Sequence, residues 1–358
     1  MKEKTEKIAS IVRPLLAWYG ANKRDLPWRG TADPYKVWVS EIMLQQTRVA
    51  AVMPYYRTWM EELPTVEALA AAEEARLMKL WQGLGYYSRA RNLQKAARII
   101  VDELGGTFPD TDEGLLRLPG IGDYTAGAVA SIAFGRPVPA VDGNVLRVAA
   151  RIANLDGDIT DPRVRREFRE LMASAMPQDC PGTFNQALMD LGASVCLPNG
   201  APLCGGCPLA GLCEANRLGI QDGLPVRKRK APRRTEELTV FLLLREGRLA
   251  LRKRSGQGLL AGLWEFPNVP GKLDEAAAAQ ALAGWGIVPA DWRKKLDAKH
   301  IFTHVEWHMT GYLLEITGGA DGGFAWVDRA GLEALAVPSA FGKYLEEARQ
   351  ALEGGTPQ

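Results

Sequence analysis

Four of the five cysteines lie in one short stretch, and closely spaced cysteine thiolates are metal ligands. Their order is Cys196-x7-Cys204-x2-Cys207-x5-Cys213. A 4Fe-4S cluster needs one cysteine for each iron, which suits this set. Zinc is the alternative, but zinc ribbons usually have two Cys-x2-Cys pairs and this stretch has one. We therefore predict an iron–sulfur cluster in the loop 196–213, with a structural role because the loop holds no candidate base or nucleophile.

A second stretch is suited to bind an anion. Gly120 and Gly122 belong to a Pro-Gly-Ile-Gly turn, and helical periodicity follows it. Glycine can adopt backbone conformations closed to other residues, and it leaves neighbouring amides uncovered. Amides at a helix N-terminus attract an anion such as a DNA phosphate. An ordinary turn between two helices is the simpler interpretation.

Two carboxylates stand in contrasting surroundings. Glu41 follows Val37 and Trp38 in an apolar helical segment, where burial would raise its pKa. Asp142 precedes a helix that we expect to start near Gly143, where the amides that it caps would hold it ionised. A neutral acid and an ionised carboxylate can divide proton donation and charge stabilisation between them. A surface carboxylate and a plain N-cap are the simpler alternatives.

Hydrophobic periodicity indicates which elements position these residues. Between residues 5 and 220, apolar residues recur at helical spacing, and proline and glycine separate the segments. The helical segments are 8–18, 35–60, 75–80, 90–104, 124–133 and 145–152. We predict an all-α domain of about ten helices over residues 1–220.

The character of the sequence changes near residue 221. Residues 221–236 hold two prolines and a cluster of arginine and lysine, which indicates a solvated linker, a basic strap along DNA, or both. Residues 237–358 contain strand-like alternation and an alanine-rich helix at 274–284. We predict a C-terminal α+β domain there.

Bulk properties are compatible with this division. The chain has 358 residues, 47% hydrophobic and 24% charged, so two globular domains are expected. A net charge of +2 permits a nucleic-acid partner without requiring one. No apolar run is long enough to span a membrane, and the charged N-terminus lacks a signal core. We expect a cytoplasmic monomer with no membrane partner.

In combination, these features resemble the helix-hairpin-helix DNA glycosylases. Further motifs narrow the resemblance to the adenine DNA glycosylase (MutY) family, over about residues 7–345: Leu26–Arg29, Ser40–Val49, Gly83–Asn92, and Gly258–Pro267 of a Nudix-like C-terminal domain. The resemblance implies a hairpin at about 114–134 and a C-terminal domain that recognises 8-oxoguanine. It implies a base excision repair enzyme that flips adenine, mispaired with 8-oxoguanine or guanine, out of double-stranded DNA and hydrolyses its glycosidic bond.

The resemblance also assigns roles to single residues. Glu41 matches the general acid, Asp142 matches the aspartate that stabilises the oxocarbenium ion, and Tyr124 and Asn144 match their partners. The expected DNA contacts are Arg29, Gln46, Thr47, Leu84, Tyr86, Gly120, Gly122, Phe302, Thr303 and His304. Two departures from the family pattern concern Thr303, where serine is common, and the first cysteine spacing, where seven residues replace six.

Three rival functions follow from single features. Bifunctional relatives such as endonuclease III carry a lysine at the position of Tyr124, and a phenol cannot form their Schiff base, so we predict an abasic product without strand cleavage. A non-catalytic iron–sulfur DNA-binding protein is the second rival. A Nudix nucleotide hydrolase is the third, but the helix at 274–280 has too few carboxylates for its magnesium. The four-residue spacing of His300, His304 and His308 would suggest a metal site on a helix, but we predict strand and loop there, which makes metal binding the minor alternative.

Overall fold

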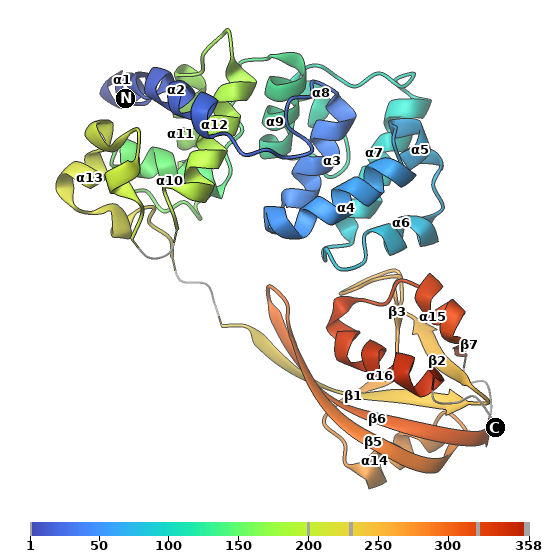
Figure 1. Cartoon of the computed structure of the whole chain (residues 1–358). Coiled ribbons are helices and arrows are strands. Elements are labelled where there is room, and N and C mark those ends of the chain that lie inside the picture. Colours follow the sequence, from blue (N-terminus) through green and yellow to red (C-terminus); the bar gives the residue numbers. More distant parts are fainter. Residues whose placement is uncertain (1, 199–200, 229–231, 320–322, 354–358) are drawn as a thin grey trace. The chain divides into compact units, whose positions relative to one another are not determined.

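The computed structural model describes residues 2–198, 201–228, 232–319 and 323–353 (Figure 1). Contacts divide the chain into two units. The first comprises Met1–Ala72 and Arg91–Arg229, and the second comprises Glu73–Ala90 and Lys230–Gln358. No helix among the described residues is long and apolar enough to cross a membrane. The domain limits expected above stay a prediction.

The first unit is all-α, as the periodicity predicted. Its helices are α1 (Lys2–Ser10), α2 (Val12–Asn22), α3 (Pro34–Leu44), α4 (Val49–Glu62), α5 (Val66–Ala71), most of α7 (Ser88–Asp102), α8 (Asp112–Leu115), α9 (Asp123–Phe134), α10 (Gly143–Ile152), α11 (Pro162–Ser174), α12 (Pro181–Ser194) and α13 (Glu214–Leu218). Short 3-10 turns follow at Cys204–Gly206, Ala210–Leu212 and Gln221–Gly223. The predicted segment 35–60 is two helices, because the chain turns at Gln46, whose φ is 59°.

Side-chain caps explain where several of these helices begin. Asp33 accepts hydrogen bonds from the first amides of α3, and proline occupies the first helical position. Asp161 caps α11 in the same way, again with proline next. Asp142 caps α10, which begins at Gly143 as predicted. Each cap is local in the sequence, so these boundaries could be predicted.

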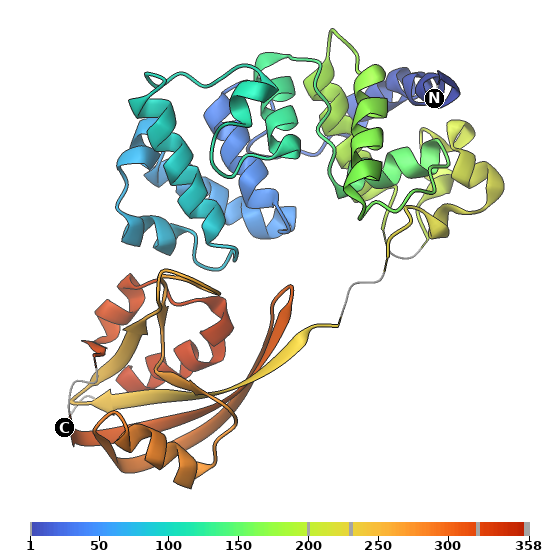
Figure 2. The ribbon, with the colours of Figure 1, turned by 180° about the vertical axis from the view of Figure 1, so that it is seen from behind.

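The N-terminal helices pack against the end of the first unit rather than against their neighbours in sequence. Ile8, Ile11 and Leu15 share one core with Phe168 of α11 and Phe184 of α12. The views in Figures 1 and 2 show α1 and α2 beside α11 and α12, while α3, α4, α5, α7, α8 and α9 form a separate group. The chain therefore forms the first helices of one group, then the whole of the other group, and then the remaining helices of the first group. Residues that are distant in sequence consequently meet where the two groups adjoin.

The second unit is built on a mixed sheet, which confirms the α+β prediction. The strand order is β3-β2-β1-β6-β5, with β1 parallel to β6 and the other pairs antiparallel. Its elements are α6 (Glu74–Leu80), β1 (Arg234–Arg245), β2 (Arg248–Lys253), β3 (Trp264–Glu265), β4 (Asn268–Pro270), α14 (Glu275–Ala283), β5 (Ile287–Ile301), β6 (Val305–Gly319), β7 (Ala325–Val327), α15 (Arg329–Ala334), a 3-10 turn at Ser339–Phe341 and α16 (Gly342–Glu353).

Alternation along β1 gives this sheet two buried faces. Val240 and Leu242 belong to a core shared with Tyr344 of α16. Phe241 and Leu243 belong to the opposite core. Successive side chains of a strand point to opposite faces, so one strand supplies both layers. Figure 1 shows α16 on one side of the sheet and α14 on the other.

The predicted glycine turn lies between α8 and α9, and its two glycines differ. Gly120 has a φ of 80°, and a Cβ there would lie 2.6 Å from Cβ of Asn92. Gly122 is extended, with a φ of −104° that any residue adopts, and open space surrounds its Cα. No side chain caps the first amides of α9. The predicted need for a backbone conformation that favours glycine is thus confirmed at Gly120. Gly122 has no such need, and its role is to leave the amides at the start of α9 uncovered.

Replacing each glycine by alanine tests this difference. We expect Gly120→Ala to lower the free energy of unfolding by about 1–3 kcal/mol, because it meets both a left-handed backbone and a close contact. Gly122→Ala is the matched control and should change stability by less than about 0.5 kcal/mol. Urea denaturation followed by circular dichroism measures both. Equal losses for the two variants would contradict the assignment.

Candidate active site

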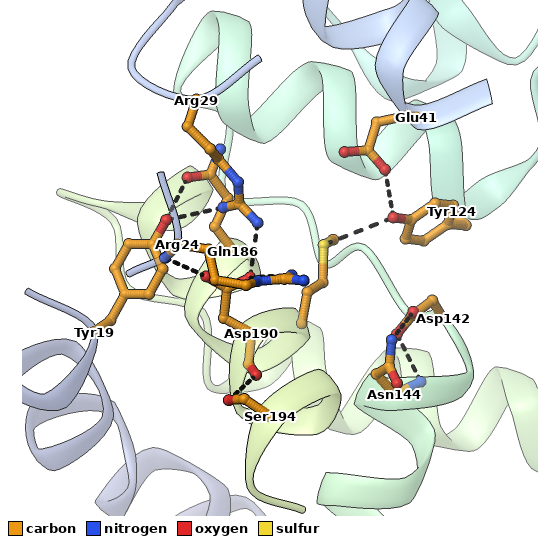
Figure 3. A network of polar contacts seen from close by, with 11 residues as sticks. Tyr19, Arg24, Arg29, Glu41, Tyr124, Asp142, Asn144, Gln186, Asp190 and Ser194 are labelled. Atoms are coloured by element: carbon orange, nitrogen blue, oxygen red, sulfur yellow. Dashed lines mark hydrogen bonds and ion pairs between the residues drawn. The ribbon is translucent and has the colours of Figure 1, made fainter. Parts of the chain in front are cut away.

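Glu41 lies on the inner side of α3 and is only 5% exposed. The hydroxyl of Tyr124, on α9, donates a hydrogen bond to its Oε2 (Figure 3). Burial raises the pKa of the Glu41 carboxyl above its ordinary value, while the Tyr124 hydrogen bond and the Arg29 charge act in the opposite direction. Glu41 is therefore a carboxyl group that tends to keep its proton, as a general acid requires.

Tyr124 is held as a neutral donor. Burial raises its pKa well above the usual value, and the nearby Glu41 and Asp142 add to the effect. Its hydroxyl also lies 3.6 Å from Sδ of Met189, on α12. The phenol therefore connects helices from both groups of the first unit at the position of Glu41.

Asp142 caps α10 with one oxygen and contacts a side chain with the other. The amides of Asn144 and Val145 donate to Oδ1 at 2.9 and 2.8 Å, and Nδ2 of Asn144 donates to Oδ2 at 2.8 Å. These donors favour the ionised form, as predicted. Burial is the larger effect, however, and it raises the pKa of Asp142 above the ordinary value. The N-cap is confirmed, but capping alone does not decide the charge.

Hydrogen bonds continue from Asn144 to the cysteine loop. Arg147 donates from Nη2 to Oδ1 of Asn144 at 2.9 Å, and from Nε to the carbonyl of Cys196 at 2.8 Å. One turn further along α10, Arg151 donates from Nη1 to Sγ of Cys196 at 3.2 Å and to the carbonyl of Leu197 at 3.0 Å. The path of the cysteine loop is thus fixed against the helix that Asp142 begins.

The cysteine loop fits a metal cluster in its chemistry. The four predicted ligands are free thiols, and they line one cavity together with Arg151. Burial raises the pKa of Cys207 to about 11, and the neighbouring thiols contribute. Four adjacent thiolates consequently require a compensating cation. In the described part of the chain, no three possible ligands converge on a single ion; a four-iron cluster does not need this, because each iron takes one thiolate.

The sequence did not reveal a network beside Glu41. Arg29, expected to contact DNA, donates to the hydroxyl of Tyr19 and to the carboxylate of Asp190. Arg24 binds the same carboxylate, and Tyr19 donates to Gln186. Asp190 lies 161 and 166 positions from the two arginines, so no local pattern could signal the pairing.

The other expected DNA contacts lie in several loops. Gln46 is exposed in the turn between α3 and α4, whereas Leu84 is buried. Tyr86 is 48% exposed, and its hydroxyl hydrogen-bonds the hydroxyl of Thr303 within the second unit. Two residues expected from different motifs to contact DNA are thus brought together.

The hairpin between β5 and β6 contains the rest of the predicted recognition loop. The amide of Phe302 bonds the carbonyl of Val305 at 2.8 Å, and the Phe302 ring packs edge-to-face on Trp307. His304 is exposed in the turn. His300 lies on β5 and His308 on β6, so strand and loop, not a helix, separate the three histidines as predicted.

A groove of about 1180 Å³ empty volume adjoins Tyr124. Gly122 and Thr125 of the hairpin line it together with Val141, while α11 contributes Arg165, Arg166 and Arg169. Arg169 is paired with Asp112 and Asp123, and Arg165 and Arg166 are exposed. A basic groove beside uncovered helix amides suits a phosphate backbone.

Comparison with known proteins shows to which family the chain belongs. Residues 39–174 match the HhH-GPD superfamily of base excision DNA repair proteins, and residues 239–347 match the NUDIX domain. The chain is 41% identical over 360 residues to the mouse adenine DNA glycosylase, covering 84% of this chain and 70% of the relative. The chain belongs to the adenine DNA glycosylase family. It is 39% identical to the human member over 364 residues, covering 85% of this chain and 66% of the human one.

Solved structures support the same fold for the helical region of this adenine DNA glycosylase family member. A thermostable thymine-DNA glycosylase matches with a TM-score of 0.54 and 29% identity, over 60% of this chain and 98% of that one. A trapped endonuclease III–DNA covalent intermediate matches with a TM-score of 0.52 and 24% identity, over 60% and 98%. The expected fold class is confirmed.

The hydrogen bond from Tyr124 to Glu41 leads to a testable prediction about the pKa of Glu41. Because that bond lowers the pKa of Glu41, Tyr124→Phe should raise it further, and the carboxyl should lose its proton at higher pH than in the wild type. Carbon-13 NMR titration of labelled glutamate carboxyls measures the change without DNA. Tyr35→Phe is the control, because Tyr35 lies on the same helix and donates to Leu63 instead. A lower pKa for Glu41 in Tyr124→Phe would contradict the assigned donor.

Proposed function

We propose that this enzyme excises adenine mispaired with 8-oxoguanine or guanine in double-stranded DNA, leaving an abasic site without cutting the strand. The observation on which the proposal rests is the buried Glu41 carboxyl, whose pKa burial raises and whose oxygen accepts a hydrogen bond from the Tyr124 hydroxyl. The base must leave the helical stack before its glycosidic bond can meet these groups.

Glu41 supplies the proton that adenine needs to become a good leaving group. A carboxylic acid donates near neutral pH only if its pKa is raised, and burial has that effect here. Proton donation at the base nitrogen N7 weakens the bond to the sugar. General acid catalysis of this kind contributes about 10²- to 10⁴-fold.

Asp142 acts on the sugar. As the bond to adenine breaks, positive charge develops at C1′, and a carboxylate beneath the sugar stabilises it. Three hydrogen-bond donors hold the Asp142 oxygens in place. Asn144 supplies two of these donors, which supports its proposed role as a partner of the aspartate.

The tyrosine at position 124 supports base removal without strand cleavage. A lyase forms a Schiff base between an amine and the sugar, and a phenol cannot do so. Tyr124 instead donates to the general acid. The contact between Tyr86 and Thr303 supports recognition of the opposite strand, since a residue proposed to stack on bases hydrogen-bonds a residue of the proposed 8-oxoguanine loop.

We also propose a 4Fe-4S cluster bound by Cys196, Cys204, Cys207 and Cys213. When bound, the cluster supplies structural stabilisation of the loop. The contacts of Arg147 and Arg151 to this loop support the same role, because they anchor it to α10.

The first experiment measures single-turnover adenine release. We expect the wild type to act on A:8-oxoguanine and A:G duplexes but not on T:G, and Glu41→Gln to lose about 10²- to 10⁴-fold in rate constant. Glu61→Gln, an exposed carboxylate on α4, should retain the wild-type rate. Unchanged release by Glu41→Gln would exclude Glu41 as the acid.

Borohydride trapping of the same reactions tests strand cleavage. We expect no efficient covalent adduct between the wild type and an abasic strand, because Tyr124 offers no amine. A strong adduct would favour the endonuclease III-like rival. Magnesium-dependent hydrolysis of 8-oxo-dGTP would favour the Nudix hydrolase.

The absorption spectrum of the purified protein identifies the metal. We expect a brown protein with a broad visible band, whereas zinc would leave it colourless. Cys207→Ser should weaken or abolish the band. Cys180→Ser, outside the loop, is the matched control and should keep it. A colourless wild type with stoichiometric zinc would overturn the cluster assignment.

A further inference from the structure

One buried carboxylate in the first unit holds two arginines. Asp190 lies within α12, and its side chain is 1% exposed. Arg24 donates to Oδ1 from Nε at 3.0 Å and from Nη2 at 2.5 Å, and its backbone amide approaches Oδ2 at 3.3 Å. Arg29 donates to the same Oδ1 from Nη2 at 3.0 Å. The stretch between α2 and α3 is thus fastened to α12 through one side chain.

The second arginine is close enough for its charge to act on Glu41. Arg29 is 13% exposed, and its Nη1 donates to the Tyr19 hydroxyl at 2.9 Å. Figure 3 shows its guanidinium turned toward Asp190, with Glu41 and Tyr124 on the other side of the site. The charge of Arg29 nevertheless acts on Glu41 and favours its ionised form.

We infer that Asp190 is a positioning residue for adenine excision, which holds the Arg29 guanidinium away from Glu41 and offsets its charge. The inference rests on the proposed role of Glu41 as the general acid. It adds a function for a side chain that does not touch the reacting atoms. Asp190 acts through Arg29, and Arg29 acts on Glu41.

The charge balance explains why such a residue is needed. A largely buried cation such as Arg29 favours a partner, because an uncompensated charge in the protein interior is strongly unfavourable. Glu41 is a carboxyl on which the charge of Arg29 already acts, so it is a possible partner for this arginine when Asp190 is absent. An ion pair between them would fix Glu41 as a carboxylate and remove the proton that the reaction uses. Asp190 satisfies the arginine and leaves the acid free to stay neutral.

The groups that face Glu41 set the sign of the test. They are Tyr124 from α9, Arg29 from the stretch before α3, and Asp142 at the start of α10. The acid works in its protonated form, so excision declines as pH rises through its pKa. Loss of the Asp190 charge strengthens the effect of Arg29, so the decline should occur at lower pH. Loss of the Arg24 charge leaves Asp190 to Arg29 alone, so the decline should occur at higher pH.

The experiment follows single-turnover excision from A:8-oxoguanine duplex across pH with the full-length protein. We expect Asp190→Asn to shift the decline to lower pH and to reduce the rate constant about 3- to 10-fold on the alkaline side. Asp190→Glu keeps the charge and should restore the wild-type position of the decline. Arg24→Gln should shift it in the opposite direction, and it tests the inference even if Asp190→Asn does not fold.

Glu265→Gln is the matched control. Glu265 is a buried carboxylate that pairs with Arg252 and Arg254 in the second unit. Its loss should affect stability but not the pH at which excision declines. A wild type that excises adenine together with unshifted declines in Asp190→Asn and Arg24→Gln would overturn this inference alone. A wild type that releases no adenine would instead overturn the proposed function.

Discussion

The carboxyl of Glu41 lies in the interior of a helical unit, where the charged form of an acid is less favourable than the neutral form. Water at this position would return its pKa to the ordinary range, and Glu41 would then be ionised at neutral pH and could not act as the proposed proton donor. The apolar character of α3, the neutral phenol of Tyr124 and the packing of α9 against α3 all maintain that exclusion. The active site therefore depends first on what surrounds the acid rather than on the acid itself.

Excluding water creates a second constraint, because every other charge near the acid must have a partner. Asp142 has the amides of α10 and the amide group of Asn144. Arg29 has Asp190 and the hydroxyl of Tyr19. These pairings connect the inter-helix stretch, α10 and α12 to one another. The polar network and the protonation state of Glu41 are thus two results of the same burial.

Features that depend on neighbouring residues could be predicted from the sequence. The cap at Asp142 and the left-handed Gly120 each follow from local chemistry. The break between α3 and α4 was not apparent, because no proline or glycine marks the turn at Gln46. Helical periodicity reports which residues are buried, and it does not report where a backbone turns.

Pairings across the fold were beyond the reach of the sequence. Arg29 was expected to face DNA, yet its guanidinium binds a carboxylate 161 positions away. Nothing in the apolar pattern of α12 marks Asp190 as a partner, because a polar residue in a helix is usually solvated. Family resemblance placed Glu41 and Tyr124 in one site, but only the structure gives the hydrogen bond between them.

The packing of α1 and α2 against α11 and α12 has a consequence for folding during synthesis. Helices α1 and α2 leave the ribosome before the surface that covers them, because α11 and α12 are synthesised more than a hundred residues later. Until then Ile8, Ile11 and Leu15 remain without their native core, and such exposed apolar surface is where nascent chains associate wrongly or engage chaperones. Asp190 is likewise synthesised well after Arg29 and Glu41. A chain that is still being synthesised therefore contains Glu41 and Arg29 before the carboxylate that binds this arginine.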